Sequence, residues 1–169
     1  IGHEECVRLL LGAGAAVDPV IQGVPPPLFV VCLLGHAACV RLLSSYGASR
    51  VSEYGAAEHV AADRGHAEVH AWLINSRQWS TPLHHLDVLG ATRARTLLRD
   101  GADLHAVAAE GAPSPLSLAR QREAAGAAAN GSAARLVLAA AKPWSTETHS
   151  LFPAAARARA TELLLLGHR

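Results

Sequence analysis

The sequence predicts an all-α fold, a solenoid of stacked helix-turn-helix units with short or missing β-hairpins at the turns. The first observation is a repeated phrase: GHEECVRLL at residues 2–10 returns as GHAACVRLL at 35–43 and as GHAEVHAWL at 65–73. Self-similarity at a period of about 20–50 residues indicates an array of repeats. The second observation is composition: 50% of the residues are hydrophobic, yet only 4% are aromatic and none is Met. A core built from Leu, Val and Ala favours helices.

Each repeated phrase predicts the second helix of a unit. In the CVRLL pattern, Cys39, Val40, Leu42 and Leu43 form an apolar stripe, and Arg41 faces outward. Cys6 holds the position of Cys39 in the preceding unit. Stacked helices lie about 8–10 Å apart, whereas a disulfide needs Cα atoms within about 7 Å. We therefore expect both cysteines to be unpaired, inert core thiols.

Glycines mark the turns of these units. Gly35, Gly65 and Gly90 are expected to permit the turn that leads into each second helix. Gly47 and Gly101 are expected to end second helices in the left-handed conformation.

The first helices have their own start signal, which is clearest at Thr81 and Pro82. Thr81 can cap a helix, and Pro82 at the first helical position loses no hydrogen bond that it would otherwise make. The corresponding starts are Pro26, Ala56, Thr81, Ser114 and Thr146. They divide one repeat domain, 1–169, into a partial unit at 1–25 and five units at 26–55, 56–80, 81–113, 114–145 and 146–169.

Taken together, these phrases resemble the ankyrin repeat. The resemblance is carried by STPLHHLDVLG at 80–90 and LLRDGADLHA at 97–106, with weaker copies SPLSLA at 114–119 and STETHSL at 145–151. It implies a solenoid of helix pairs whose first helices line a concave face, while the turns between units extend as β-hairpin fingers.

Several units depart from the ankyrin pattern. Only 25 residues separate Ala56 from Thr81, so no finger is expected after residue 75. An insertion, AAGAAANG, occupies 124–131 between two helices. Pro153 should cut the first helix of the last unit short, while Gly167 stays in register with the earlier turn glycines.

Charge, hydropathy and cysteine content indicate which partners the protein lacks and where it is located. The net charge is +1, too mild for a nucleic-acid footprint. No apolar run reaches the roughly 18 residues of a membrane span. Three cysteines without CxxC spacing indicate a reduced, intracellular and cytoplasmic protein. Because the chain begins at Ile1 inside a repeat phrase, we expect a piece of a longer protein, with flanking repeats or domains as neighbours.

The ten histidines raise the question of a metal site. His66 and His70 stand four residues apart, but the regular spacing of the others spreads them along the array, away from the convergence that zinc needs. His36 and His66 resemble ankyrin positions where the imidazole bonds a neighbouring backbone and ties repeats together. No GxSxG, P-loop or HExxH phrase occurs, so we expect no enzyme and no cofactor.

Binding of another protein is the predicted function. The two residues before each repeat glycine are expected to face the concave side, and two of these three pairs are apolar. The alternative is that an irregular neighbouring unit folds over them. Finger and rim residues add to the predicted site. Its members are Leu33, Leu34, Ser52, Glu53, Tyr54, Asp63, Arg64, Arg77, Trp79, Val88 and Leu89.

Some alternatives stay open at this point. Trp79 and Trp144 share the phrase WST, and each ring either contacts a partner or covers the gap left by a curtailed finger. The array could be the substrate-recognition part of a ubiquitin-ligase adaptor or a signalling scaffold, a metal-dependent or thiol enzyme, or a spacer. The four leucines at 163–166 cannot share one stripe, which favours a further unit or a partner domain beyond them.

Overall fold

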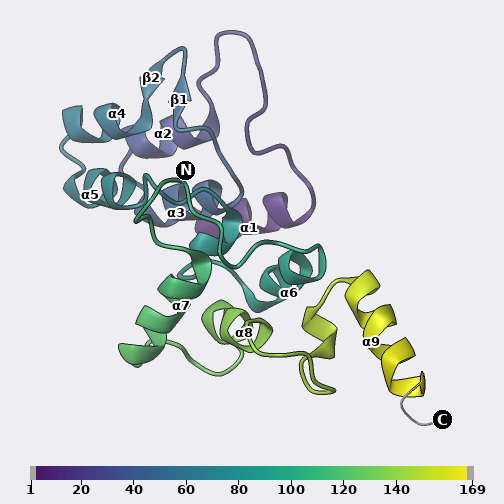
Figure 1. Ribbon diagram of the computed structural model, residues 1–169. Helices are drawn as coiled ribbons and strands as arrows, with labels where there is room; N and C mark the ends of the chain where they lie inside the picture. The colour runs from purple at the N-terminus through teal and green to yellow at the C-terminus, as the bar shows by residue number, and fades with distance from the viewer. Residues whose placement is uncertain (1–2, 167–169) are drawn as a thin grey trace. The chain divides into compact units, whose positions relative to one another are not determined.

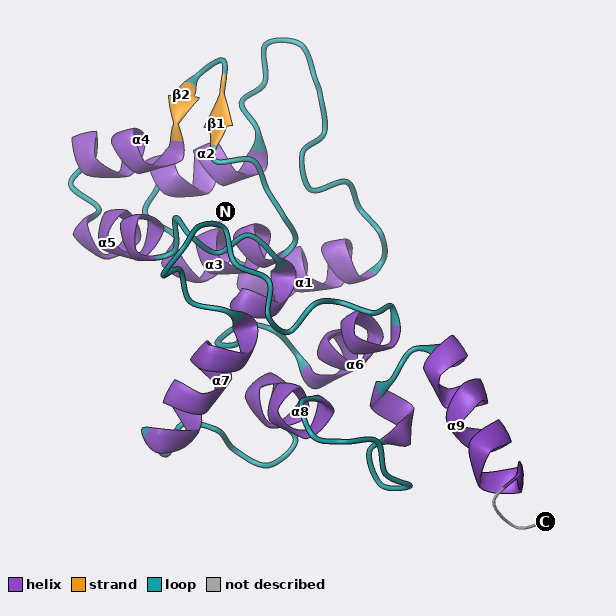
Figure 2. Cartoon of the chain, in the orientation of Figure 1, coloured by secondary structure: helices purple, strands orange, loops and turns teal. Residues whose placement is uncertain are grey.

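The computed structural model describes residues 3–166, and their side chains as far as residue 163. The described chain is helical apart from one short hairpin (Figures 1 and 2). It divides into two compact units, Ile1–Val88 and Leu89–Arg169. The predicted all-α fold is confirmed.

The first unit contains stacked helix pairs. Its elements are α1 (Glu4–Gly12), α2 (Pro27–Leu33), α3 (Ala37–Ser45), β1 (Val51–Ser52), β2 (Gly55–Ala56), α4 (Ala57–Asp63), α5 (Ala67–Asn75) and the 3-10 helix η1 (Pro82–His84). Helix α2 packs on α3, and α4 packs on α5. Between the pairs, α2 contacts α4, while α3 lies between α1 and α5. Corresponding helices of successive repeats therefore lie against one another.

The core of this unit follows the repeated apolar stripes. Cys39 and Val40 are 0% exposed, and Leu42 is 1% exposed. They belong to one hydrophobic cluster that also contains residues of α1, α2, α4 and α5. Burying a leucine or valine side chain contributes roughly 1.5–3 kcal/mol, so this stripe supplies much of the stacking energy. Arg41 reaches past the stripe and donates to Glu68 Oε1 at 2.7 Å.

Cys6 departs from the prediction, because its side chain is exposed while Cys39 is buried. Helix α3 has α1, α2 and α5 packed around it, whereas α1 meets the core through Val7 and Leu11. Cys6 projects from a different side of α1. Among the described residues, all three cysteines are unpaired thiols.

The hairpin is the only pair of strands in the described chain. Strands β1 and β2 are antiparallel, with Val51 opposite Ala56 and Ser52 opposite Gly55. It projects from the first unit in Figure 2, beside the long loop that precedes α2. No strand lies between α5 and η1, as predicted. The connection there is only 76–81, whereas the connection between α3 and α4, which contains the hairpin, is 46–56.

The turn glycines behave as predicted with one exception. Gly35 and Gly65 have φ of +74°, and Gly47 and Gly101 have φ of +86° and +84°. Gly90 has φ of −66° and is the N-cap of α6 (Ala91–Arg99). It needs no left-handed conformation because a turn at 86–88, and not the end of a full first helix, leads into α6.

The expected first helix at Thr81 is also different. Thr81 is an N-cap and Pro82 follows at the first helical position, but η1 spans only three residues. The four side chains of 83–86 are each at most 6% exposed. Four consecutive buried residues cannot lie on one face of an α-helix, so this segment folds as a tight 3-10 turn.

The second unit contains α6, α7 (Pro115–Ala124), α8 (Ala133–Ala140), the 3-10 helix η2 (His149–Leu151) and α9 (Ala154–Leu166). Helix α8 packs on both α6 and α7, and η2 packs on α6. Ser114 caps α7 in a reciprocal box with Ser117. The insertion at 124–131 forms the turn between α7 and α8.

The end of this unit is distorted around Pro153, as predicted. The expected first helix of the last unit is reduced to η2, and α9 begins directly after the proline. Arg99 Nε donates to the Ser150 carbonyl at 2.9 Å and fixes η2 against α6. Leu163 is exposed. Gly167 and the side chains of 164–166 lie outside the described residues.

Candidate functional site

The residues predicted for the concave face differ in exposure. Leu34 is 41% exposed, and Leu33 is half-buried. Asp63 and Arg64, at the end of α4, are both exposed. Leu33 also holds the next repeat, because its carbonyl lies 3.1 Å from His66 Nε2. The predicted role of this histidine in tying repeats together is confirmed.

The third predicted pair, Val88 and Leu89, was expected to face solvent, but neither side chain is exposed. Leu89 is only 6% exposed, and Val88 is half-buried. The Val88 carbonyl accepts a hydrogen bond from Arg8 Nη1 at 3.4 Å. The expectation of a solvent-facing leucine at 89 was wrong because 81–90 does not form a full first helix. The side chain of Leu89 is therefore buried, whereas those of Leu34 and Arg64 are exposed.

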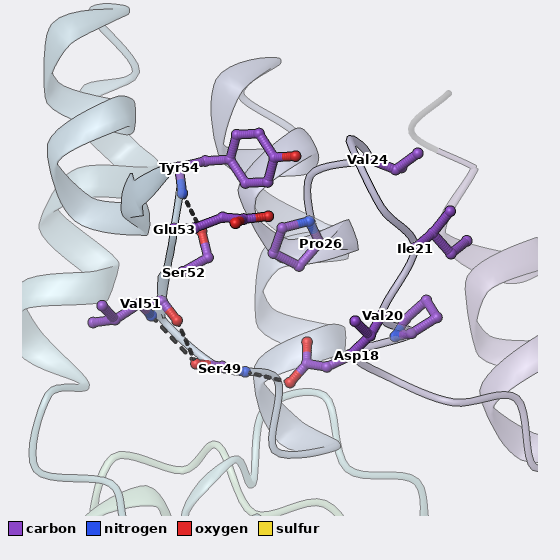
Figure 3. A pocket seen from close by; sticks show the side chains of 11 residues that line it. Asp18, Val20, Ile21, Val24, Pro26, Ser49, Val51, Ser52, Glu53 and Tyr54 are labelled. Atoms are coloured by element: carbon purple, nitrogen blue, oxygen red, sulfur yellow. Dashed lines mark hydrogen bonds between the residues drawn. The ribbon is translucent and has the colours of Figure 1, made fainter.

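A groove lies between the β1–β2 hairpin and the loop before α2 (Figure 3). Its volume is about 340 Å³, within the lower range of ligand sites. We call it the hairpin groove. Its lining residues are Asp18, Pro19, Val20, Ile21, Val24, Pro26, Ser49, Val51, Ser52, Glu53 and Tyr54.

Apolar side chains surround the hairpin groove and remain in solvent. Val20 is 101% exposed, Ile21 56% and Val51 69%. Val24 and Tyr54 are also exposed. Water-exposed aliphatic groups concentrated around a hollow mark an interaction site more often than isolated ones do.

Hydrogen bonds hold the two walls of the groove together. The Ser49 N–H donates to Asp18 Oδ2 at 2.8 Å, which links the hairpin to the loop. The Ser49 hydroxyl donates to the Val51 carbonyl at 2.7 Å, and the Tyr54 N–H donates to Ser52 Oγ at 3.2 Å. The groove is therefore preorganised, which lowers the entropic cost of binding.

The ring of Tyr54 packs against Phe29 of α2. The centroids of the two rings are 5.8 Å apart at an interplanar angle of 49°. Desolvation raises the pKa of the Tyr54 phenol, and the neighbouring Glu53 carboxylate raises it further. The phenol is thus a neutral hydrogen-bond donor next to an anionic acceptor.

A second, polar hollow occupies the place of the missing finger. Arg77, Trp79, Ser80 and Thr81 line it together with Arg50 and five others. Arg77 donates to both oxygens of Glu58, at 2.5 and 3.0 Å. This hydrogen bonding lowers the pKa of Glu58 and raises that of Arg77.

Trp79 packs inside its own unit. Its ring lies edge-on to Trp72 at 5.8 Å and to His85 at 5.1 Å. Arg50 stacks over the other side of this cluster, with its guanidinium carbon 5.5 Å from the Trp72 centroid. These contacts support the alternative in which the tryptophan covers the gap left by a curtailed finger.

Of the eleven residues that line the hairpin groove, sequence reasoning assigned three to the binding site. It singled out Ser52, Glu53 and Tyr54, but none of the loop residues opposite them. The signal that could have found them was the phrase VIQGV at 20–24, an apolar run in a segment that the repeat pattern assigns to a turn. Apolar side chains in a turn are exposed to solvent when no other element packs against them.

Comparison with known proteins identifies the repeat. A family model for ankyrin repeats, in three copies, matches residues 1–82. The chain belongs to the ankyrin-repeat family. It is also similar to the crystal structure of the human ASB11 ankyrin repeat domain, with 30% identity over 89% of this chain and 77% of that one, at a TM-score of 0.42.

Ankyrin-repeat domains are typically non-catalytic modules that bind other proteins. In the described part of the chain, no three His, Cys, Asp or Glu side chains converge on a possible metal position. Burial raises the pKa of the Cys32 thiol to about 12 and raises that of Cys39. Both thiols therefore stay protonated and poorly nucleophilic. None of the described helices has the length and apolar character to cross a bilayer.

Proposed function

We propose that this ankyrin-repeat chain binds another protein through the hairpin groove and the exposed edge beside it. The observation that carries the proposal is the ring of solvent-exposed aliphatic groups around a preorganised hollow, with Val20 and Val51 on opposite walls. The edge adds Leu34, Asp63 and Arg64, and we include Arg77, which lines the polar hollow of the same unit.

The energetics favour such a surface. Removing apolar area from water contributes about 25 cal/mol per Å², and the lining side chains are already ordered before a partner arrives. Tyr54 provides a rigid aromatic group of the kind enriched at binding hot spots. Leu89 is left out of the proposed surface because its side chain is buried.

The test is affinity capture with the 169-residue chain as bait, followed by mass spectrometry. The double variant Ile21→Lys/Val51→Lys places positive charges on both walls of the groove. Since both positions are more than half exposed, folding should be retained, which circular dichroism would verify. We expect this variant to lose the specific partner.

Val107→Lys is the matched control. Val107 is 52% exposed and is not among the residues that line the groove, so the substitution adds a charge of the same sign at a comparable exposure. If the Ile21/Val51 variant retains every partner that the control retains, the groove is not the binding surface.

The adaptor and scaffold alternatives refine the same proposal. Both require a recognition surface plus a second protein bound elsewhere. A ubiquitin-ligase subunit that co-purifies equally with the wild type and the groove variant would favour the adaptor. We also propose the repeat boundaries 26–55, 56–80, 81–113, 114–145 and 146–169 as the units of this array.

A further inference from the structure

We propose that the hairpin groove selects a basic side chain, lysine or arginine, within an extended aliphatic segment of the partner protein. This inference rests on the proposed function, because it names the chemistry of the segment that the groove would hold.

The charges that line the groove are all of one sign. Asp18 projects from the loop and Glu53 from the hairpin (Figure 3). No Lys, Arg or His is among the lining residues, all of which lie in the described part of the chain. A surface with two carboxylates among exposed aliphatic groups is complementary to a cation with apolar neighbours.

Asp18 has a free hydrogen-bonding position. Its Oδ2 atom accepts the Ser49 N–H, but its Oδ1 atom is buried and has no hydrogen-bond partner. Unsatisfied buried polar atoms are rare in folded proteins because each forfeits the hydrogen bonds it had with water. The carboxylate therefore keeps an uncompensated negative charge beside the groove, which a bound cation would stabilise electrostatically.

The cations nearest in sequence do not neutralise the groove. Arg50 separates two lining residues, but its guanidinium donates to the Leu73 carbonyl at 3.0 Å and to Ser76 Oγ at 2.9 Å. Arg77 is held by Glu58. Both guanidinium groups are therefore committed to other partners, and the negative potential of Asp18 and Glu53 remains for a ligand.

The apolar walls determine what flanks the cation. Val20, Ile21 and Val51 are exposed on either side of the carboxylates. A volume of about 340 Å³ accommodates a few side chains, and not a whole helix, whose diameter is about 10–12 Å. An extended segment, with the basic residue between aliphatic ones, fits this combination.

The test uses synthetic peptide libraries with randomised aliphatic flanks around one fixed central residue. The central residue is arginine, lysine, citrulline or glutamate, and citrulline keeps the shape of arginine without its charge. Binding to the immobilised 169-residue chain is quantified by mass spectrometry. We expect arginine and lysine to be enriched roughly tenfold over citrulline, the lower end of what a hydrogen bond to a charged group contributes.

Variants assign the preference to individual carboxylates. Asp18→Asn retains an oxygen for the Ser49 N–H but removes the charge, and Glu53→Gln does the same on the hairpin. Each should reduce the enrichment several-fold, and higher salt should weaken it because exposed charges are screened. Asp87→Asn, at an exposed position of the same unit outside the groove, is the control and should change nothing.

The outcomes separate this inference from the proposed function. Equal recovery of all libraries, preference for glutamate, or insensitivity to both variants overturns the basic-residue preference even if a partner is still lost from the Ile21/Val51 variant. If the groove instead holds a second copy of this chain, sedimentation will show a dimer that the same variant dissociates, which also overturns the inference.

Discussion

Gly35→Ala is the substitution whose cost the structure defines most sharply. Gly35 lies in the turn between α2 and α3 with φ of +74°, a conformation that disfavours any Cβ atom. A Cβ at this position would also lie 2.4 Å from Nδ1 of His66 and 2.6 Å from its Cε1. The ring that ties the next repeat to this turn would have to move.

Two contributions make up the expected loss. The left-handed conformation costs alanine roughly 1–2 kcal/mol. Displacing the imidazole of His66 breaks its hydrogen bond to Leu33, worth about 1 kcal/mol, and disturbs the packing around it. Gly65 is the matched control, because it has the same φ but no atom lies within 4 Å of the point where an alanine methyl would sit. We expect Gly35→Ala to cost about 3 kcal/mol and Gly65→Ala about half of that.

Urea unfolding followed by tryptophan fluorescence measures both losses. A Trp144→Phe background restricts the signal to Trp72 and Trp79 of the first unit. In a His66→Ala background the steric conflict is gone, so Gly35→Ala should then cost no more than the left-handed conformation alone. The reasoning is refuted if the two glycine variants are equally destabilised, or if the excess cost of Gly35→Ala persists without the imidazole.

Three further predictions concern single side chains of the first unit. Iodoacetamide at pH 8 should rapidly alkylate only Cys6 in the folded protein, because Cys32 and Cys39 are buried. Cys6→Ser should therefore abolish the rapid reaction. The pKa of Glu58 is lowered by Arg77, so the stability it contributes is present above its unfolded pKa of about 4.3 and is lost as the pH falls through the folded value. The difference in unfolding free energy between wild type and Glu58→Gln should therefore vanish in acid. Arg50→Lys should lower the unfolding free energy by about 2 kcal/mol, since lysine cannot form both hydrogen bonds to the end of α5.

The parts of the fold that sequence reasoning recovered depend on short-range patterns. The stripe at 39–43 is buried as predicted because its period matches the helix that it forms. The absence of a finger after α5 followed from counting residues alone. The helix start at Ser114 was recovered because its cap is made within four residues.

The predictions that went wrong depend on what surrounds a residue. Cys6 and Cys39 occupy the same place in the repeat, yet only the second has helices packed around it. Leu89 and Leu34 hold equivalent positions before a repeat glycine. The segment before Leu89 contains a 3-10 helix in place of a full first helix, and Leu89 is buried while Leu34 is exposed. Equal sequence patterns do not guarantee equal neighbours.

The amino-acid sequence alone determined that helix pairs repeat and where most of them begin and end. These properties come from hydrophobic periodicity and capping, which act over a few residues. Only the tertiary structure decided that Asp18 and Glu53 share one groove. They come from different repeats, and stacking, not spacing along the chain, places their carboxylates on facing walls.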